Sequence, residues 1–220
     1  MKSEGMSDRE VVFKNRAEAG RVLAAQLHQY RGSDALVLAL PRGGVPVAAE
    51  VASVIDAELD VIISRKIGAP GNPELAIGAV TSDGAILLND ALVATLNVGE
   101  DFIDHSVSQA RREIAEYTRL YRGERPVPKI TGRIVIIVDD GIATGYTVLA
   151  AVQASLRKNP KELIIAVPVA QRESVYELEE ATGCQVIAVV QPTLFIAVGQ
   201  FYEDFQQVPD AQVRSILQSY

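Results

Sequence analysis

The sequence predicts an α/β domain in which a mostly parallel central sheet is flanked by helices. Apolar runs of strand length alternate with helical patterns along most of the chain, as they do where crossover helices join parallel strands. These runs are continuously apolar, for example at residues 134–138, which is typical of strands covered on both faces. The 220 residues, of which 48% are hydrophobic, are enough to bury a substantial core.

The first part of the chain supplies helices and strands in alternation. Apolar residues at helical spacing predict a helix over 16–30. The elements predicted next are a strand at 35–40, a helix at 45–55 and a strand at 60–64. Residues 65–74 contain two glycines and two prolines, so we expect them to be irregular.

A hairpin and a long helix are predicted next. Asp83-Gly84 stands between the apolar runs 76–82 and 85–89, and this dipeptide favours a two-residue hairpin turn. Residues 101–122 carry apolar and aromatic side chains at alternating steps of four and three, which predicts an amphipathic helix. This stripe packs either on the sheet of the same chain or on a second subunit, and we expect a homodimer.

The remaining elements complete the sheet and add a C-terminal segment. Strands are predicted at 134–138, 163–169 and 186–190, and helices at 147–156, 173–182 and near 210–218. We expect one domain over 1–220, with its core at about 35–190. An insertion made of the hairpin and the long helix, and a small C-terminal hood at about 191–220 that packs with the N-terminal helix, complete the expected architecture.

The composition excludes several classes of protein. The chain has 21 basic and 28 acidic residues and a net charge of −7, so we expect no broad binding of nucleic acids or acidic membranes. A single cysteine, Cys184, fits a reducing cytoplasm, and with only two histidines it leaves no basis for a His/Cys zinc cluster. The polar N-terminal residues predict no leader peptide, and no apolar run has the length of a transmembrane helix.

The strongest candidate site follows the strand at 134–138. Ligands of parallel sheets bind outside the carboxyl ends of the strands, and a helix N-terminus presents unpaired N–H groups to a phosphate. Two carboxylates repel a phosphate but suit sugar hydroxyls or hydrated magnesium. The pattern therefore indicates a phosphorylated sugar as ligand, the alternative being a plain strand end with a helix cap. The residues are Asp139, Asp140, Gly141, Ile142, Ala143, Thr144, Gly145, Tyr146 and Thr147.

The segment 134–147 resembles the motif with which type I phosphoribosyltransferases bind 5-phosphoribosyl 1-pyrophosphate (PRPP). The resemblance extends over residues 35–190, and the chain is similar to a bacterial subgroup usually called predicted phosphoribosyltransferases. It implies magnesium-dependent transfer of the 5-phosphoribosyl group from PRPP to a nitrogenous acceptor, with release of pyrophosphate. It also implies that Asp139 and Asp140 hold the ribose hydroxyls while 143–147 surround the 5′-phosphate. Magnesium would be held mainly by the substrate, with help from these two acids.

The resemblance extends to the leaving group. Residues 40–44, Leu-Pro-Arg-Gly-Gly, are similar to the pyrophosphate loop of the family, which assigns Arg42, Gly43 and Gly44 to the pyrophosphate. Lys66 stands where related enzymes carry an Arg-Lys pair, and would meet the same group. An ordinary strand-to-helix turn and a solvated charge pair are the alternatives at these two places.

The residues expected around the acceptor differ from the family pattern. Ala143 replaces the acid of hypoxanthine-guanine enzymes and residues 168–171 lack their lysine, so a 6-oxopurine is disfavoured. Gly141 replaces an apolar side chain, which predicts a wider floor beneath the acceptor. Within the hood, residues 191–205 would cover the acceptor, and three aromatic side chains there either stack on it or pack in the core. These side chains are Phe195, Tyr202 and Phe205.

Two other functions stay open at this point. A regulatory protein could keep the PRPP site as a sensor without transferase activity. A different sugar-phosphate enzyme, such as a phosphorylase, could use the same motif. For the enzyme, the expected ligands are PRPP and a small-molecule acceptor, and the expected location is the cytoplasm.

Overall fold

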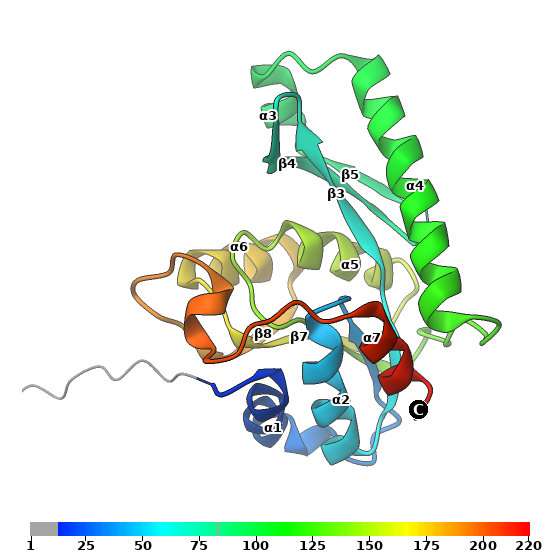
Figure 1. Cartoon of the computed structure of the whole chain (residues 1–220), viewed down its shortest axis with the longest axis vertical. Coiled ribbons are helices and arrows are strands. Elements are labelled where there is room, and N and C mark those ends of the chain that lie inside the picture. Colours follow the sequence, from blue (N-terminus) through cyan, green and yellow to red (C-terminus); the bar gives the residue numbers. More distant parts are fainter. Residues whose placement is uncertain (1–12, 83) are drawn as a thin grey trace, which may run out of the picture.

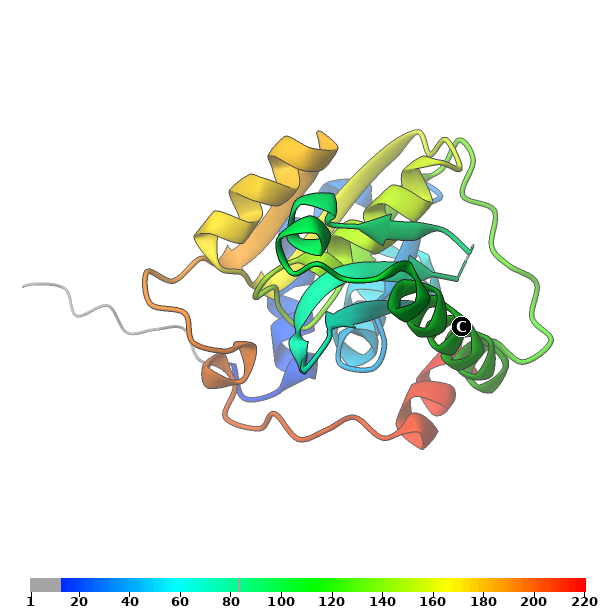
Figure 2. The same cartoon turned by 90° about the horizontal axis from the view of Figure 1, so that it is seen from above.

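A five-stranded parallel sheet in the order β2-β1-β6-β7-β8 forms the centre of the computed structural model, which describes residues 13–82 and 84–220. Helices cover both faces of this sheet (Figures 1 and 2), so the predicted fold class is confirmed. The strands are β1 (Leu36–Ala39), β2 (Glu58–Val61), β6 (Ile134–Val138), β7 (Glu162–Val169) and β8 (Gln185–Val190).

Alternate residues of the strands point into two separate cores. Val37 and Ile136 share one core with helices α1, α2 and α7, whereas Leu36 and Val135 share the other with α5 and α6. Because successive side chains of a strand point to opposite faces, continuously apolar strands fill both cores. The helices are α1 (Arg16–Gln26), α2 (Gly44–Ile55), α5 (Tyr146–Leu156), α6 (Arg172–Thr182) and α7 (Asp210–Leu217).

Three antiparallel strands form a second, smaller sheet in the order β3-β4-β5. The prediction that residues 65–74 are irregular is wrong, because most of them lie in β3 and β4. Gly71 turns the chain with a φ of 76°, and Gly68 lies at a bulge where an added Cβ would be 2.6 Å from the Pro73 carbonyl oxygen. The glycines thus occupy a turn and a bulge without ending the ladder. The strands are β3 (Ser64–Ala69), β4 (Asn72–Thr81) and β5 (Ile86–Leu88).

The predicted hairpin is confirmed by the antiparallel pairing of β4 with β5. The predicted two-residue turn is wrong, because Thr81 and not Ser82 stands opposite Ala85, which leaves three residues between the paired positions. The Thr81 N–H donates to the Ala85 carbonyl oxygen at 3.0 Å across the turn. Gly84 has a φ of 86°, while Asp83 lies outside the described residues. A short helix that the sequence analysis did not predict, α3 (Asp90–Thr95), follows β5 and is capped by the Asn89 side chain.

The long helix α4 (Glu100–Arg122) packs its stripe within the same chain. Val107, Ala110, Ile114 and Tyr121 are buried and share a core with side chains of β3, β4 and α7. Of the two packing alternatives, the structure therefore shows the one within the chain, and the stripe gives no support to a homodimer. We call α3, α4 and β3–β5 the arm, which stands away from the central sheet in Figure 1.

Backbone pairing ties the hood to the first described residues. Phe13 and Tyr202 form an isolated parallel bridge. The Phe13 N–H donates to the Phe201 carbonyl oxygen at 2.8 Å, and the Glu203 N–H donates to that of Phe13 at 2.8 Å. A turn of 3-10 helix at Val198–Phe201 precedes this bridge. Over residues 13–82 and 84–220, no helix has the length and apolar character needed to cross a membrane.

A buried ion pair joins the arm to the central sheet. Arg122, the last residue of α4, donates from Nε to Asp60 Oδ2 at 3.0 Å and from Nη2 to the Val61 carbonyl oxygen at 3.1 Å. The side chains of Arg122 and Asp60 are only 10% and 6% exposed. Removing one partner of such a pair leaves a desolvated charge without compensation.

We therefore expect Asp60→Ala to lower the free energy of unfolding by about 3–5 kcal/mol, because Arg122 loses its counter-ion. Urea unfolding measures this loss. The control is Glu50→Ala, which removes the partner of Arg21 in a pair whose arginine is 57% exposed and should lose at most about 1 kcal/mol. Equal losses in the two variants would contradict the anchoring role of Asp60.

Candidate functional site

The carboxyl ends of β1 and β6 lie side by side at one edge of the central sheet. Ala39 is paired with Val138, and the Leu40 N–H donates to the Val138 carbonyl oxygen at 2.9 Å. The loop after each strand leads into a helix, α2 after β1 and α5 after β6. The two loops therefore meet at the edge where ligands of parallel sheets bind.

Gly43 and Gly44 bring the first loop directly against the two acids. A Cβ added to Gly43 would lie 1.9 Å from Asp140 Oδ2, and one added to Gly44 would lie 2.9 Å from the Asp139 Cα atom. A side chain at either position would collide with the second loop, since carbon atoms in contact lie about 3.5–4.0 Å apart. Both glycines are therefore required for the close packing of the two loops.

Asp139 and Asp140, which we call the acidic pair, face different partners. Asp140 Oδ2 accepts from Nε of Arg16 at 2.8 Å, and the Asp140 carbonyl oxygen accepts from the Tyr202 hydroxyl at 2.6 Å. Asp139 Oδ1 accepts from the backbone N–H of Asp140 at 2.8 Å. In the described part of the chain, Asp139 has no cationic partner, so its carboxylate is the one that a ligand can engage.

Burial makes the charged form of the acidic pair costly. It raises the pKa of the Asp139 carboxyl well above its usual range, and the neighbouring Asp140 charge raises this pKa further. Burial also raises the pKa of Asp140, against the opposing effect of the Arg16 guanidinium. The pKa of the Tyr202 hydroxyl is raised by burial and by the Asp140 charge, so this phenol stays protonated and donates. Shifts of this kind are typical of functional sites.

Contacts with β7 and α6 fix the turn that follows the acidic pair. Ile142 is buried, and its N–H donates to the Val169 carbonyl oxygen at 2.9 Å. The Ser174 hydroxyl donates to the Ala143 carbonyl oxygen. Gly145 has a φ of 73°, which glycine adopts without strain. These contacts hold the N-terminus of α5 at the sheet edge.

A pocket of about 190 Å³ lies between Asp139 and the N-terminus of α5. Helix α5 has no side-chain cap, which leaves N–H groups of its first turn for an anion. The Thr144 side chain beside them is exposed. The structure thus brings together Asp139 and the predicted turn residues. The pocket is lined by Asp139, Gly141, Ile142, Ala143, Thr144, Gly145, Tyr146, Thr147, Val148 and Val198.

The two predicted cations lie outside the lining of this pocket. Arg42 Nη1 is 3.7 Å from Asp210 Oδ1 of α7, and Asp210 also accepts from the buried Tyr121 hydroxyl. Lys66 is exposed on β3 and lines another pocket, of about 380 Å³, between the β3–β4 hairpin and α4. Arg42 remains next to the glycine loop, whereas Lys66 is not brought together with the acidic pair.

The hood covers the pocket with Val198. This side chain lines the pocket, and its Cγ1 lies 2.5 Å from the place that a Cβ on Gly141 would occupy. The prediction of a wider floor at Gly141 is therefore wrong, because a hood side chain fills the space that the glycine leaves.

The aromatic side chains of the hood pack mainly on one another. Phe195 and Phe201 have ring centroids 5.5 Å apart, and Tyr202 and Phe205 have theirs 5.0 Å apart. Phe201 and Tyr202 belong to a small core with Phe13. The structure thus shows the core-packing alternative for these rings, with Phe195 and Phe205 only partly buried.

The donors at the acidic pair fit a magnesium ion that the protein does not enclose. Carboxylate oxygens are hard ligands of the kind that Mg²⁺ prefers, and Asp139 offers such a group beside the pocket. Across residues 13–82 and 84–220, no group of three or more His, Cys, Asp and Glu side chains is arranged to hold a metal. A magnesium ion would therefore take most of its ligands from a phosphate-bearing molecule and from water.

The sequence analysis missed two residues of this site. Arg16 lies 124 positions before Asp140, and Val198 belongs to a hood whose fold no local pattern predicts. Neither residue has a spacing relation to the motif, so tertiary structure alone reveals them.

Comparison with known proteins assigns the family. Residues 12–205 match the model of the phosphoribosyl transferase domain. The chain belongs to this family. The matched phosphoribosyl transferase domain includes Arg16, both loops and the first half of the hood, while α7 lies beyond it.

Solved structures share the fold of this chain. The crystal structure of TT1426 from Thermus thermophilus is 38% identical in sequence, with a TM-score of 0.81 over 94% of this chain and 98% of that chain. A hypothetical protein from Neisseria gonorrhoeae with bound ppGpp has a TM-score of 0.51 and 10% identity over 94% of this chain and 96% of that one. The second likeness shows the fold of the phosphoribosyl transferase domain alone.

The curated relatives are longer than this chain. Two proteins from Mycobacterium tuberculosis, "Putative phosphoribosyl transferase Rv0571c" and "Putative phosphoribosyl transferase MT0597", are each 40% identical over 206 residues. The match covers 94% of this chain and 46% of each relative. The chain therefore spans about half the length of the curated relatives that it matches.

The raised pKa of Asp139 predicts a gain in stability when its charge is removed. A carboxyl whose pKa is higher in the folded state favours folding at low pH, and this stability is lost as the pH rises through the folded pKa. We therefore expect Asp139→Asn to raise the free energy of unfolding by about 0.5–2 kcal/mol at pH 8, with the gain disappearing toward pH 4. Thermal melts measure it. The exposed Asp104, changed to Asn, is the control, and a gain that is equal at both pH values would contradict the explanation.

Proposed function

We propose that this protein transfers the 5-phosphoribosyl group of PRPP to a nitrogenous acceptor in a magnesium-dependent reaction that releases pyrophosphate. The observation that carries the proposal is the acidic pair beside the uncapped N-terminus of α5, in a chain of the phosphoribosyl transferase domain family. Sugar hydroxyls and a phosphate are the two groups that such a pair and such a helix end bind.

The proposed pose places the 5′-phosphate at residues 143–147. The first N–H groups of α5 and the exposed Thr144 side chain support this assignment. Asp139, at the opposite side of the pocket, would then accept hydrogen bonds from a ribose hydroxyl, with Asp140 next to it. A pocket of about 190 Å³ suits the phosphoribosyl group.

The pyrophosphate would lie at the loop that ends in Gly43 and Gly44. The N–H groups of Gly44 and Val45 at the start of α2 already donate to backbone carbonyl oxygens, and Pro46 has none. The Arg42 guanidinium would therefore be the group that stabilises the charge on the leaving group. We also propose that Lys66 on β3 supplies a further positive charge to the pyrophosphate. Strand β3 is linked to the start of α5, because the hydroxyl of its first residue, Ser64, donates to the Thr147 carbonyl oxygen at 3.4 Å.

The reaction requires no covalent bond between the protein and its substrates. A lone pair on the acceptor nitrogen forms a bond to C1 of the ribose, the bond from C1 to the pyrophosphate oxygen breaks, and pyrophosphate leaves with that electron pair. The positive charge that develops on the ribose ring is favoured by the nearby acidic pair. Bound magnesium would offset negative charge on the pyrophosphate, while the residues of the two loops orient the sugar and the leaving group.

The acceptor would enter beneath the hood. Val198 over Gly141 forms an apolar side of the pocket, and we propose that Phe195, Tyr202 and Phe205 support it. A 6-oxopurine remains disfavoured because residues 168–171 provide no lysine to its oxo group.

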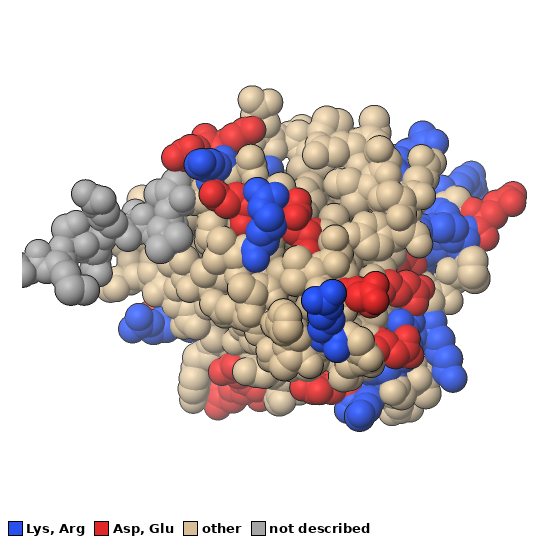
Figure 3. Space-filling view, turned by 90° about the horizontal axis from the view of Figure 1, so that it is seen from below, with Lys and Arg blue, Asp and Glu red and all other residues tan. Residues whose placement is uncertain are grey.

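We further propose that the protein acts on small molecules in the cytoplasm, with no nucleic-acid or membrane surface as partner. The net charge of −7 supports this, because both surfaces are polyanions. On the face drawn in Figure 3, acidic and basic side chains of the described residues are interspersed around a broad uncharged area.

The decisive test is the double variant Asp139→Asn with Asp140→Asn. It keeps the size of both side chains but removes their charges, so each charge-assisted hydrogen bond lost should cost about 1.5–3 kcal/mol. We expect turnover to fall by roughly 10²–10⁴. A screen of pyrophosphate release from magnesium–PRPP over a panel of nitrogenous bases identifies the acceptor and then measures this loss.

His105→Ala is the matched control and should leave turnover unchanged. The proposal fails if the double variant releases pyrophosphate as the unaltered protein does, or if it does not fold. Binding of PRPP without pyrophosphate release for any base would instead establish a sensor.

A homodimer formed through the arm is a separate proposal. Leu75, Leu96 and Phe102 of the arm are 38%, 41% and 37% exposed, and burial of these apolar side chains would favour association. We expect light scattering at micromolar concentration to give twice the chain mass, and Phe102→Asp to weaken the association at least tenfold. A monomer mass for the unaltered protein excludes a stable dimer.

A further inference from the structure

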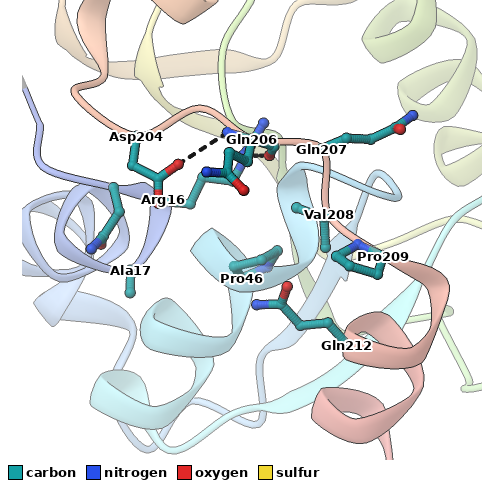
Figure 4. Close-up of a pocket in the computed structure, with 10 residues that line it drawn as sticks. Arg16, Ala17, Pro46, Asp204, Gln206, Gln207, Val208, Pro209 and Gln212 are labelled. Atoms are coloured by element: carbon teal, nitrogen blue, oxygen red, sulfur yellow. Dashed lines mark hydrogen bonds between the residues drawn. The ribbon is translucent and has the colours of Figure 1, made fainter.

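Arg16 occupies an unusual place for a side chain at the start of a helix. It is the first residue of α1, yet its side chain is only 11% exposed. Its Nε donates to Asp140 Oδ2 at 2.8 Å, and its Nη1 donates to the Gln206 carbonyl oxygen at 2.8 Å. The guanidinium carbon lies 3.9 Å from the centre of the Phe205 ring. Figure 4 shows Arg16 reaching from α1 toward the hood segment that carries Gln206.

This arrangement gives Asp140 a fixed orientation. Its carboxylate lies between Arg16 and the backbone of Gly43, where even a methyl group would not fit. The Tyr202 hydroxyl holds its carbonyl oxygen from the hood side. A buried guanidinium with two directed hydrogen bonds and an aromatic face has little freedom to move, so Asp140 has none of the rotational freedom of an exposed acid.

The same contact changes the charge that a ligand meets. Two adjacent carboxylates carry a charge of −2 when both are ionised, which repels a phosphorylated ligand. Arg16 reduces the net charge of the cluster to −1 and leaves Asp139 as the acid that lines the pocket. The titratable and charged groups facing Asp140 come from α1, from β6 and from the hood. They are Arg16, Asp139 and Tyr202.

We propose that Arg16 is a positioning residue of the phosphoribosyl site, which orients Asp140, offsets one charge of the acidic pair and links that pair to the hood at Gln206. The proposal rests on the proposed function, since it concerns binding of the same ligand. The contact between Arg16 and the hood lies next to a second link between the same two segments. Phe13, three residues before Arg16, forms backbone hydrogen bonds with the hood.

The test compares Arg16→Met, which keeps an apolar stem but loses the charge, with Arg16→Lys, which keeps the charge but loses the planar head. Arg21→Met is the control, because Arg21 lies on the same helix in an exposed pair with Glu50. Calorimetric titration with magnesium–PRPP near neutral pH gives the dissociation constant of each variant. Thermal melts establish that each variant is folded.

We expect Arg16→Met to weaken binding roughly 10–100-fold near neutral pH. Arg16→Lys should bind only several-fold more weakly than the unaltered protein, because it keeps the charge beside Asp140. Arg21→Met should match the unaltered protein throughout.

The outcomes separate the possible failures. Binding by Arg16→Met that equals binding by the unaltered protein overturns the inference. Binding by Arg16→Lys that is as weak as binding by Arg16→Met also overturns it, because the retained charge should restore most of the affinity. If Arg16→Met does not fold, Arg16→Lys decides, and its unaltered affinity overturns the inference. If the unaltered protein itself does not bind magnesium–PRPP, the proposed function fails and the inference fails with it.

Discussion

The close approach of the glycine loop to the acidic pair is the constraint on which the site depends. Gly43 and Gly44 lie so near Asp140 and Asp139 that no side chain fits between the loops. Parallel pairing of β1 with β6 places both strand ends at one edge, and each loop then begins a helix without a side-chain cap. The N-terminus of α5 and the two carboxylates are thus brought together, so the place where an anion can bind is separate from the place where hydroxyls can bind.

The central sheet provides the position of the acidic pair but not its charge balance. Between β1 and β8, the described chain supplies no cation within ion-pair distance of Asp140; Arg16 from α1 does so. The hood holds Arg16 through the Gln206 carbonyl oxygen and the Phe205 ring. Segments at the two ends of the described chain therefore complete a site that the middle of the chain builds, which explains why N-terminal residues and the hood are bonded to each other.

The sequence predicted the features that depend on local pattern. Continuous apolar runs identified the strands of the central sheet, and the order of acids, glycines and threonines after β6 identified the turn. The prediction of irregular structure at residues 65–74 was wrong, because Gly68 and Gly71 lie at a bulge and a turn of one hairpin and do not end its strands. The sequence analysis also missed contacts between distant segments. The filling of the space over Gly141 by Val198 follows from the path of the hood, for which the sequence has no periodic signal.

The site works against the stability of the fold that carries it. Burial raises the pKa of both acids, and α5 begins without the side-chain cap that commonly stabilises a helix. These features are unfavourable for an empty protein but suit a ligand with hydroxyls and phosphates, which supplies the missing partners. The Arg16 contacts and the bonds between Phe13 and the hood offset part of this deficit. A ligand that satisfies the remaining groups should therefore stabilise the protein most at the sheet edge, where the unpaired groups are concentrated.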